Sequence, residues 1–185
     1  MDYQIFDDCL NDKDFQVFRY LANPDPYETQ VPESCPADMD LKIDMHYNGT
    51  VSEDSDKSSH YFVHLLYQNF TKESPWFDLV LDPLIRRFSF YGLLRGKINW
   101  YPQTRSIIEH GSHLDMSNLP RYKNLLVYAN DNDGFTRLSN PFGEDVVIES
   151  KANRVVIFDG GIHHNSTTCT DAKMRCTVNF NFVEM

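Results

Sequence analysis

The second half of the chain, from Gly92 onward, is built of short runs in which polar and apolar residues alternate. In the last run, residues 175–182 read Arg-Cys-Thr-Val-Asn-Phe-Asn-Phe, so every second residue is apolar. Side chains of a strand point alternately to its two faces, so this pattern is typical of strands with one polar and one apolar face. Gly, Asn, Asp and Pro separate the runs at roughly ten-residue spacing, as expected of a sandwich or barrel.

Strands are predicted in this half at residues 97–101, 105–110, 122–130, 134–137, 145–149, 154–158 and 175–183. The dipeptide Asp133-Gly134 lies between two of them and favours a hairpin turn.

The first part of the chain has apolar residues at helical spacing. Helices are predicted at residues 12–21, from Ser58 and Ser59 to Phe70, and from residues 74–75 to about residue 90. Residues 41–46 alternate as in a half-buried strand, and the polar stretches 23–38 and 49–57 are predicted loops. The 185 residues suit one domain, predicted at 1–185, with a helical part at about 1–92 and a β core at about 93–185.

Charge and apolar content exclude several classes of protein. The chain has 27 acidic and 17 basic residues and a net charge of −10, which repels phosphate backbones, so no nucleic acid partner is expected. No apolar stretch is long enough to span a bilayer, so no membrane is expected. The first ten residues resemble no secretion signal, and the four cysteines form no C-x-x-C pair. These features predict a cytoplasmic protein and leave its oligomeric state open.

A candidate metal site begins in the run at 109–115, Glu-His-Gly-Ser-His-Leu-Asp. On an extended segment His113 and Asp115 project to the same side. A third ligand can come from His163 or His164, which follow an apolar strand and two glycines. Two histidines and one carboxylate leave coordination positions open, as in non-haem Fe(II) centres that bind oxygen and a co-substrate. Taken alone, however, His-x-Asp is more often a surface turn in which Asp115 caps the next segment.

Arg175 can supply a counter-charge for an anionic co-substrate. It lies on the polar face of the last predicted strand together with Thr177, and this face points inward if the apolar face is core. An inward guanidinium pairs with a carboxylate in bidentate fashion, so a dicarboxylate fits. The same alternation places Tyr128 and Tyr101 where their hydroxyls can reach the pocket. Arg175, Thr177 and both tyrosines are therefore predicted to bind the co-substrate.

Several segments of the second half form one ordered pattern. They are Lys-Ile-Asn-Trp-Tyr-Pro at 97–102, His-Leu-Asp at 113–115, Leu-Val-Tyr-Ala-Asn-Asp-Asn-Asp-Gly at 126–134 and Asn-Arg-Val-Val-Ile-Phe-Asp-Gly at 153–160, then His164 and Arg175. Asp115 and His164 are 49 residues apart, and His164 and Arg175 are 11 apart. In this order and spacing the chain resembles the 2-oxoglutarate/iron(II)-dependent oxygenases, most of all their prolyl-4-hydroxylase-like branch and small virus-encoded members.

The resemblance implies a mainly β chain with N-terminal helices around a double-stranded β-helix, which is a cupin-like jelly roll. It also implies that His113, Asp115 and His164 are the catalytic iron ligands, because the family motif selects His164 over His163.

For the co-substrate, the resemblance implies that Arg175 binds the far carboxylate of 2-oxoglutarate, assisted by Tyr128 and Tyr101. The implied activity requires Fe(II), 2-oxoglutarate and O2. It hydroxylates an unidentified substrate and releases succinate and CO2. The substrate would be a peptidyl or free prolyl-type side chain, or a small metabolite. The alternative is a non-catalytic jelly roll that binds a ligand or another protein.

Overall fold

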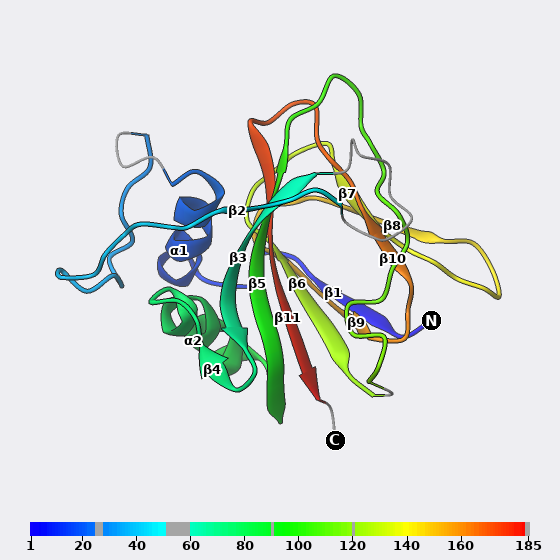
Figure 1. Ribbon diagram of the computed structural model, residues 1–185, viewed down its shortest axis with the longest axis horizontal. Coiled ribbons are helices and arrows are strands. Elements are labelled where there is room, and N and C mark those ends of the chain that lie inside the picture. The colour runs from blue at the N-terminus through cyan, green and yellow to red at the C-terminus, as the bar shows by residue number, and fades with distance from the viewer. Residues whose placement is uncertain (25–27, 51–59, 90, 120, 184–185) are drawn as a thin grey trace.

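The computed structural model describes residues 1–24, 28–50, 60–89, 91–119 and 121–183 (Figure 1). The helices in these ranges are α1 (Asp12–Ala22) and α2 (Phe77–Arg87). The strands are β1 (Tyr3–Phe6), β2 (His46–Asn48), β3 (Tyr61–Gln68), β4 (Thr71–Lys72), β5 (Gly92–Pro102), β6 (Lys123–Tyr128), β7 (Phe135–Leu138), β8 (Val146–Glu149), β9 (Arg154–Asp159), β10 (His164–Ser166) and β11 (Met174–Val183).

The strands form two antiparallel sheets, which we call the major and the minor sheet. The major sheet has the order β1-β9-β6-β11-β5-β3-β2, with β4 paired to β3, and the minor sheet has the order β10-β7-β8. The last strand, β11, lies between β5 and β6, so the centre of the major sheet is made of segments distant in sequence. Figure 1 shows the helices on one side of the major sheet and the minor sheet on the other. The predicted jelly roll is confirmed.

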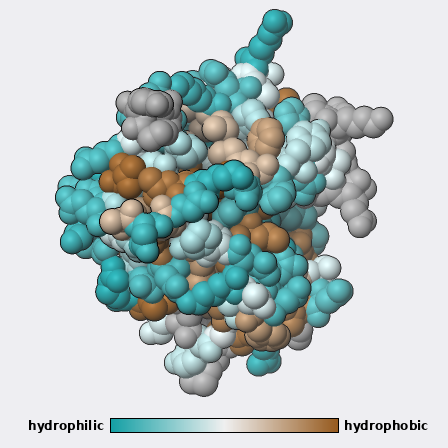
Figure 2. Space-filling view, turned by 60° about the vertical axis from the view of Figure 1, so that its left-hand side comes forward, coloured by the Kyte–Doolittle hydropathy of each residue, from teal (hydrophilic) through white to brown (hydrophobic). Residues whose placement is uncertain are grey.

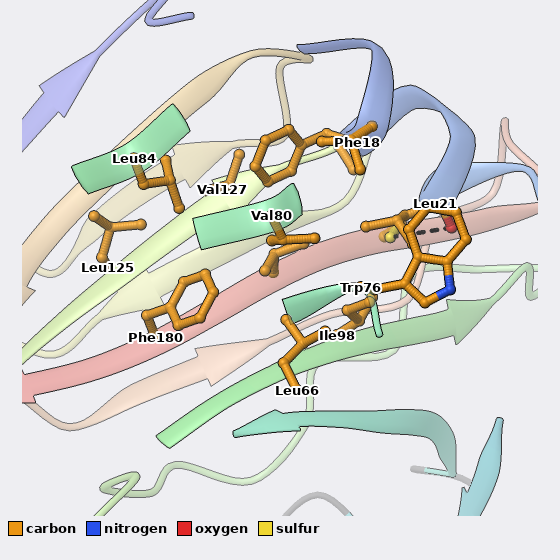
Figure 3. Packing of buried hydrophobic residues seen from close by; sticks show 14 of the residues in the cluster. Phe18, Leu21, Leu66, Trp76, Val80, Leu84, Ile98, Leu125, Val127 and Phe180 are labelled. Carbon is orange, nitrogen blue, oxygen red and sulfur yellow. Dashed lines mark hydrogen bonds between the residues drawn. The ribbon is translucent and has the colours of Figure 1, made fainter. Parts of the chain in front are cut away.

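Two apolar clusters cover the two faces of the major sheet. The first joins both helices to the strands beneath them and includes Phe18, Leu21, Val80, Leu84 and Phe180 (Figure 3). The buried Trp100 indole donates a hydrogen bond from Nε1 to the carbonyl oxygen of Leu21 at 2.7 Å, which ties β5 to the end of α1. The second cluster lies between the sheets and contains Leu126, Tyr128, Leu138, Ile148, Val156 and Phe158.

The alternation predicted for residues 175–182 is confirmed. Its apolar residues belong to the first cluster, whereas Arg175, Thr177 and Asn179 line a cavity between the sheets. Because β11 has strands on both sides and layers on both faces, its polar face is buried as well. The central strand therefore places polar groups inside the molecule, where they need partners.

The prediction of a helix that ends at Phe70 is wrong, because residues 61–68 form β3. The two serines expected to cap that helix lie outside the described residues. β3 pairs with β2 and β5, and its two faces both carry apolar residues, with Phe62 and Leu66 on the helix side. Apolar residues on both faces of a strand remove the period of two and leave spacings that also suit a helix.

Two predictions in the second half are also wrong. Residues 105–110 form no strand, although Glu109 makes an isolated bridge to Thr167. Asp133-Gly134 closes no hairpin, because β6 belongs to the major sheet and β7 to the minor sheet. A Cβ atom on Gly134 would lie 2.7 Å from Cδ of Arg175, so close packing against that side chain requires glycine here.

The remaining predicted elements are present with changed bounds. The helix at 12–21 is α1, capped by the Asn11 side chain, which accepts a hydrogen bond from the backbone N–H of Asp14 at 3.0 Å. The helix predicted from 74–75 to about 90 is the shorter α2. Residues 41–45 alternate in burial but form no strand, and β2 begins at His46. The described residues of 23–38 form a loop, and most of 49–57 lies outside the described residues.

The surface on the helix side is mostly hydrophilic, with smaller apolar areas between the polar side chains (Figure 2). Neither of the described helices is long and apolar enough to cross a membrane.

Candidate metal centre and anion site

Three side chains from distant segments meet at the cavity between the sheets: His113, Asp115 and His164. The backbones of His113 and His164 pair as an antiparallel bridge, with N···O distances of 3.1 and 3.0 Å. Asp115 lies two residues beyond His113 in an extended segment, so it faces the same way. One ligand atom of each side chain lies within 4.8 Å of the others. These three residues could therefore hold one metal ion.

Among the described residues, each imidazole makes a hydrogen bond through Nδ1 and none through Nε2. His113 Nδ1 lies 3.2 Å from the carbonyl oxygen of Gly111, and His164 Nδ1 lies 3.4 Å from that of Ile162. A carbonyl oxygen only accepts, so each Nδ1 carries the proton and each Nε2 keeps its lone pair. Burial lowers the pKa of both rings, that of His164 to about 4, so both are neutral at neutral pH. Neutral imidazoles are the form that binds metals.

The side chain of Asp115 is 1% exposed but remains ionised. Burial acts to raise its pKa, but the positive charge around it, led by Lys97, holds the pKa far below the usual range. Arg95 Nη2 donates to Oδ1 at 2.8 Å, and Lys97 Nζ lies 3.5 Å from the same oxygen. Asn179 Nδ2 donates to Oδ2 at 2.9 Å, and Oδ2 lies 3.6 Å from His164 Nε2. Oδ2 is therefore the oxygen that faces the imidazoles.

Arg175 lies in the same cavity and is 1% exposed. Its guanidinium donates from Nε to Ser150 Oγ and from Nη2 to Thr136 Oγ1, both at 2.9 Å, and Nη1 lies 3.4 Å from the carbonyl oxygen of Thr167. No acid forms an ion pair with it among the described residues. Since a buried cation is unfavourable without a counter-ion, Arg175 is suited to bind an anion.

The other residues predicted to bind the co-substrate surround Arg175. Its guanidinium lies 5.2 Å from the ring centroid of Tyr101 and 5.5 Å from that of Tyr128. Tyr101 and Thr177 line the cavity, and burial raises the pKa of Tyr101 to about 12, so its hydroxyl keeps its proton. The hydroxyl of Tyr128 donates to Thr136 Oγ1 at 2.8 Å and so supports a partner of Arg175.

Together with the open space at its mouth, the cavity contains about 360 Å³ not filled by atoms. Its further lining residues are Lys97, Asn99, Leu126, Thr136, Phe158, Ser166 and Asn179. The alternation of β5 and β11 indicates which of these residues face inward on the major sheet. Thr136 and Ser166 come from the minor sheet, and no sequence signal pointed to them. Arg95 was also missed, because its role depends on its contact with Asp115.

His163, the alternative third ligand, does not join this cluster. It is exposed and lines a different cavity with Phe142 and Ile162. Neighbouring side chains of an extended segment face opposite sides, so the buried position of His164 turns His163 outward.

Comparisons with known proteins reveal a shared fold. No protein-family model matches the sequence, and no curated protein matches it. A prolyl-4-hydroxylase from Pseudomonas putida is 12% identical, with a TM-score of 0.62 over 98% of this chain and 92% of its own. An oxidoreductase of the 2OG-Fe(II) oxygenase family from Burkholderia pseudomallei is 13% identical, with a TM-score of 0.57 over 77% and 74%.

A third solved structure with this fold is a prolyl hydroxylase from Trichoplax adhaerens in complex with a peptide fragment of the hypoxia inducible factor oxygen degradation domain. It is 15% identical, with a TM-score of 0.58 over 98% of this chain and 83% of its own. At such identities the similarity establishes the fold, and function has to be argued from the site.

Proposed function

We propose that the protein is an Fe(II)- and 2-oxoglutarate-dependent dioxygenase that hydroxylates its substrate and releases succinate and CO2. One observation carries the proposal: a single cavity contains two neutral histidines, an ionised carboxylate and a buried guanidinium without an acidic partner among the described residues. The ligand set suits Fe(II), and the guanidinium suits the carboxylate of a co-substrate. The fold shared with oxygenases of this type supports the reaction class.

In this proposal His113, Asp115 and His164 hold the iron through the two Nε2 atoms and Oδ2. Iron, 2-oxoglutarate and O2 together supply the oxidising chemistry. The protein orients the three ligand side chains before any metal binds. The carbonyl oxygens of Gly111 and Ile162 orient the rings, and the bonds to Oδ1 orient the carboxylate.

Arg175 would bind the far carboxylate of 2-oxoglutarate. Ser150 and Thr136 hold its guanidinium in place, and the side chains of Tyr101 and Thr177 line the same cavity. Because these groups are buried, the co-substrate leaves bulk water when it binds, which strengthens its ionic contacts.

For the primary substrate we propose a peptidyl or free prolyl-type side chain, or a small metabolite. Two solved structures with this fold are prolyl hydroxylases, one of them in complex with a peptide, which supports the first class. The net charge of −10 disfavours nucleic acid as a substrate.

Anaerobic optical spectroscopy tests the proposal. Adding Fe(II) and 2-oxoglutarate to the purified protein is expected to produce the weak visible charge-transfer band of the chelated complex. Asp115→Ala is expected to abolish iron binding, whereas Arg175→Gln should retain iron and weaken 2-oxoglutarate binding by at least about tenfold. His164→Ala should lose the iron, and His163→Ala serves as the matched control that keeps it.

A folded wild-type protein that produces no band at saturating Fe(II) and 2-oxoglutarate would overturn the proposal. Equal and negligible effects of the Asp115 and Arg175 variants would overturn the residue roles.

A further inference from the structure

The inward side chains of β5 and β11 form a ladder of cross-strand pairs. In order along the strands, the pairs are Tyr101–Arg175, Asn99–Thr177, Lys97–Asn179 and Arg95–Asn181. Arg175 and Arg95 occupy its two ends, about 20 Å apart at 3.3 Å per residue. Asp115 accepts hydrogen bonds from the last two pairs. The ladder thus has a cation at one end and two, Arg95 and Lys97, beside the metal ligands. We call these two the Arg95–Lys97 pair.

The Arg95–Lys97 pair has N–H groups that donate no hydrogen bond to the residues that the structure describes. Arg95 donates from Nε to Asn181 Oδ1 at 3.0 Å and from Nη2 to Asp115, which leaves Nη1 without a bond within the described ranges. Lys97 has three N–H groups and one ion pair in those ranges, at 3.5 Å from Asp115 Oδ1. The two side chains are 22% and 15% exposed, so a solute can reach them.

The charges of the site do not balance without a further anion. Arg95 and Lys97 pair with the carboxylate of Asp115, and Arg175, which lines the same cavity as Lys97, has no acidic partner among the described residues. Bound Fe(II) and the 2-oxoglutarate dianion cancel each other, so two positive charges remain. In a cavity shielded from water such an excess is unfavourable.

A buried acceptor between the two ends of the ladder also lacks a partner. Asn99 is 2% exposed and lines the cavity, and its Oδ1 has no hydrogen-bond partner among the described residues. Buried polar atoms are nearly always bonded to protein, water or ligand. Asn99 therefore indicates that a hydrogen-bond donor, either water or a donor group of the substrate other than its carboxylate, completes this part of the cavity.

We infer that Arg95 and Lys97 bind a carboxylate of the primary substrate, which is therefore an organic acid. This inference rests on the proposed function, because it names the substrate of that same site. The guanidinium and ammonium groups offer unused donors to one carboxylate, in the charge-assisted form that is strongest. The net charge of −10 repels extended polyanions.

Binding of two probes of equal shape tests the inference on the metal-free protein: isobutyrate, which is an anion, and isobutyramide, which is neutral. In ligand-observed NMR titrations at low salt we expect isobutyrate to bind at least about tenfold more tightly than isobutyramide. In the Arg175→Gln protein, where isobutyrate cannot pair with Arg175, Lys97→Gln and Arg95→Gln should each remove most of this preference, and Arg95→Lys should retain it. Lys97→Gln leaves the 2.8 Å bond between Arg95 and Asp115, so it keeps the carboxylate paired.

Two control variants separate this site from other cations. Arg86→Gln removes a cation paired with Asp14, away from the cavity, and should leave both affinities unchanged. Arg175→Gln should leave the Arg95-dependent isobutyrate binding in place. Equal affinity for the two probes, or a preference lost in Arg175→Gln and kept in the folded Arg95 and Lys97 variants, overturns the inference. The charge-transfer band reports the proposed function separately, because it depends on the iron ligands and Arg175.

Discussion

Asp115 belongs to the candidate metal centre and also contacts the Arg95–Lys97 pair. Its two oxygens have different partners: Oδ1 faces Arg95 and Lys97, and Oδ2 faces Asn179 and His164. One carboxylate can therefore bind a metal on one side while the cations on its other side keep it ionised. The same cations would lie close to a metal bound at Asp115, so the proposed metal and substrate sites would be electrostatically linked.

Gly96 separates Arg95 from Lys97 and permits their placement. A Cβ atom at Gly96 would overlap the ring of the fully buried Phe180, with 2.7 Å to Cδ1. Gly96→Ala is therefore expected to lower the free energy of unfolding by about 1–3 kcal/mol, as overpacking does in cores. Urea denaturation measures this loss.

Gly92 provides the matched control on the same strand. A Cβ atom there would meet only Val183, at 3.9 Å, which is ordinary contact. Gly92→Ala should change stability by less than about 0.5 kcal/mol. Equal stability of the two variants would show that β5 shifts freely relative to Phe180.

At the scale of elements, α1 closes the apolar side of the major sheet over Trp100 and Phe180. Its first turn is capped by Asn11, whose Oδ1 accepts from the N–H of Asp14. Asn11→Ala should reduce the free energy of unfolding by about 1 kcal/mol, because that N–H loses its partner. The exposed Lys13→Ala is the control, expected within about 0.5 kcal/mol of wild type in the same denaturation experiment. A loss no larger than that of the control would contradict the capping role.

The faces of β11 were predictable because alternation depends only on the strand itself. This was enough to place Arg175 and Thr177 inside and Phe180 in the core. β3 was mistaken for a helix, because a strand covered on both faces has no polar side to reveal its period. The contact of Arg95 with Asp115 depends on the register between β5 and a loop about 20 residues away, which tertiary packing decides.

The candidate iron ligands could be proposed as a set of three only through the order of motifs along the chain. The local sequence does not decide whether His163 or His164 is the third ligand, since both follow the same apolar strand. The side chain that turns inward is set by the bridge between His113 and His164, a contact between segments 51 residues apart. The hydroxyls that hold Arg175, from Ser150 and Thr136, come from outside the major sheet and carry no sequence signature.

At the scale of the whole molecule, the charged side chains that line the cavity are mostly positive, whereas the net charge of the chain is negative. The protein carries a net charge of −10, while its central cavity is lined by two cations, Lys97 and Arg175, one carboxylate, that of Asp115, and two neutral imidazoles. Folding buries these imidazoles in their neutral form, so the stability of the entire domain depends on pH.

His110 allows this dependence to be measured without touching a proposed iron ligand. It is 2% exposed, its Nδ1 contacts Ser166 Oγ at 2.8 Å, and burial, together with the charge of Arg175, lowers its pKa to about 4. In the unfolded chain the ring takes up its proton near pH 6.5. Between these values the unfolded state binds more protons, so the free energy of unfolding decreases as the pH falls from 6.5 to 4, by up to about 3 kcal/mol for this residue.

His110→Gln is expected to flatten this part of the profile, because glutamine takes up no proton and can still bond to Ser166. Urea denaturation of the metal-free protein at several pH values between 7 and 4 measures the slope. The exposed His46→Gln is the control and should leave the wild-type slope in place. If the His110 variant keeps that slope as well, the ring is protonated in the folded protein near its ordinary pKa. The layer between Tyr101 and the minor sheet would then be open to water instead of closed around the cavity.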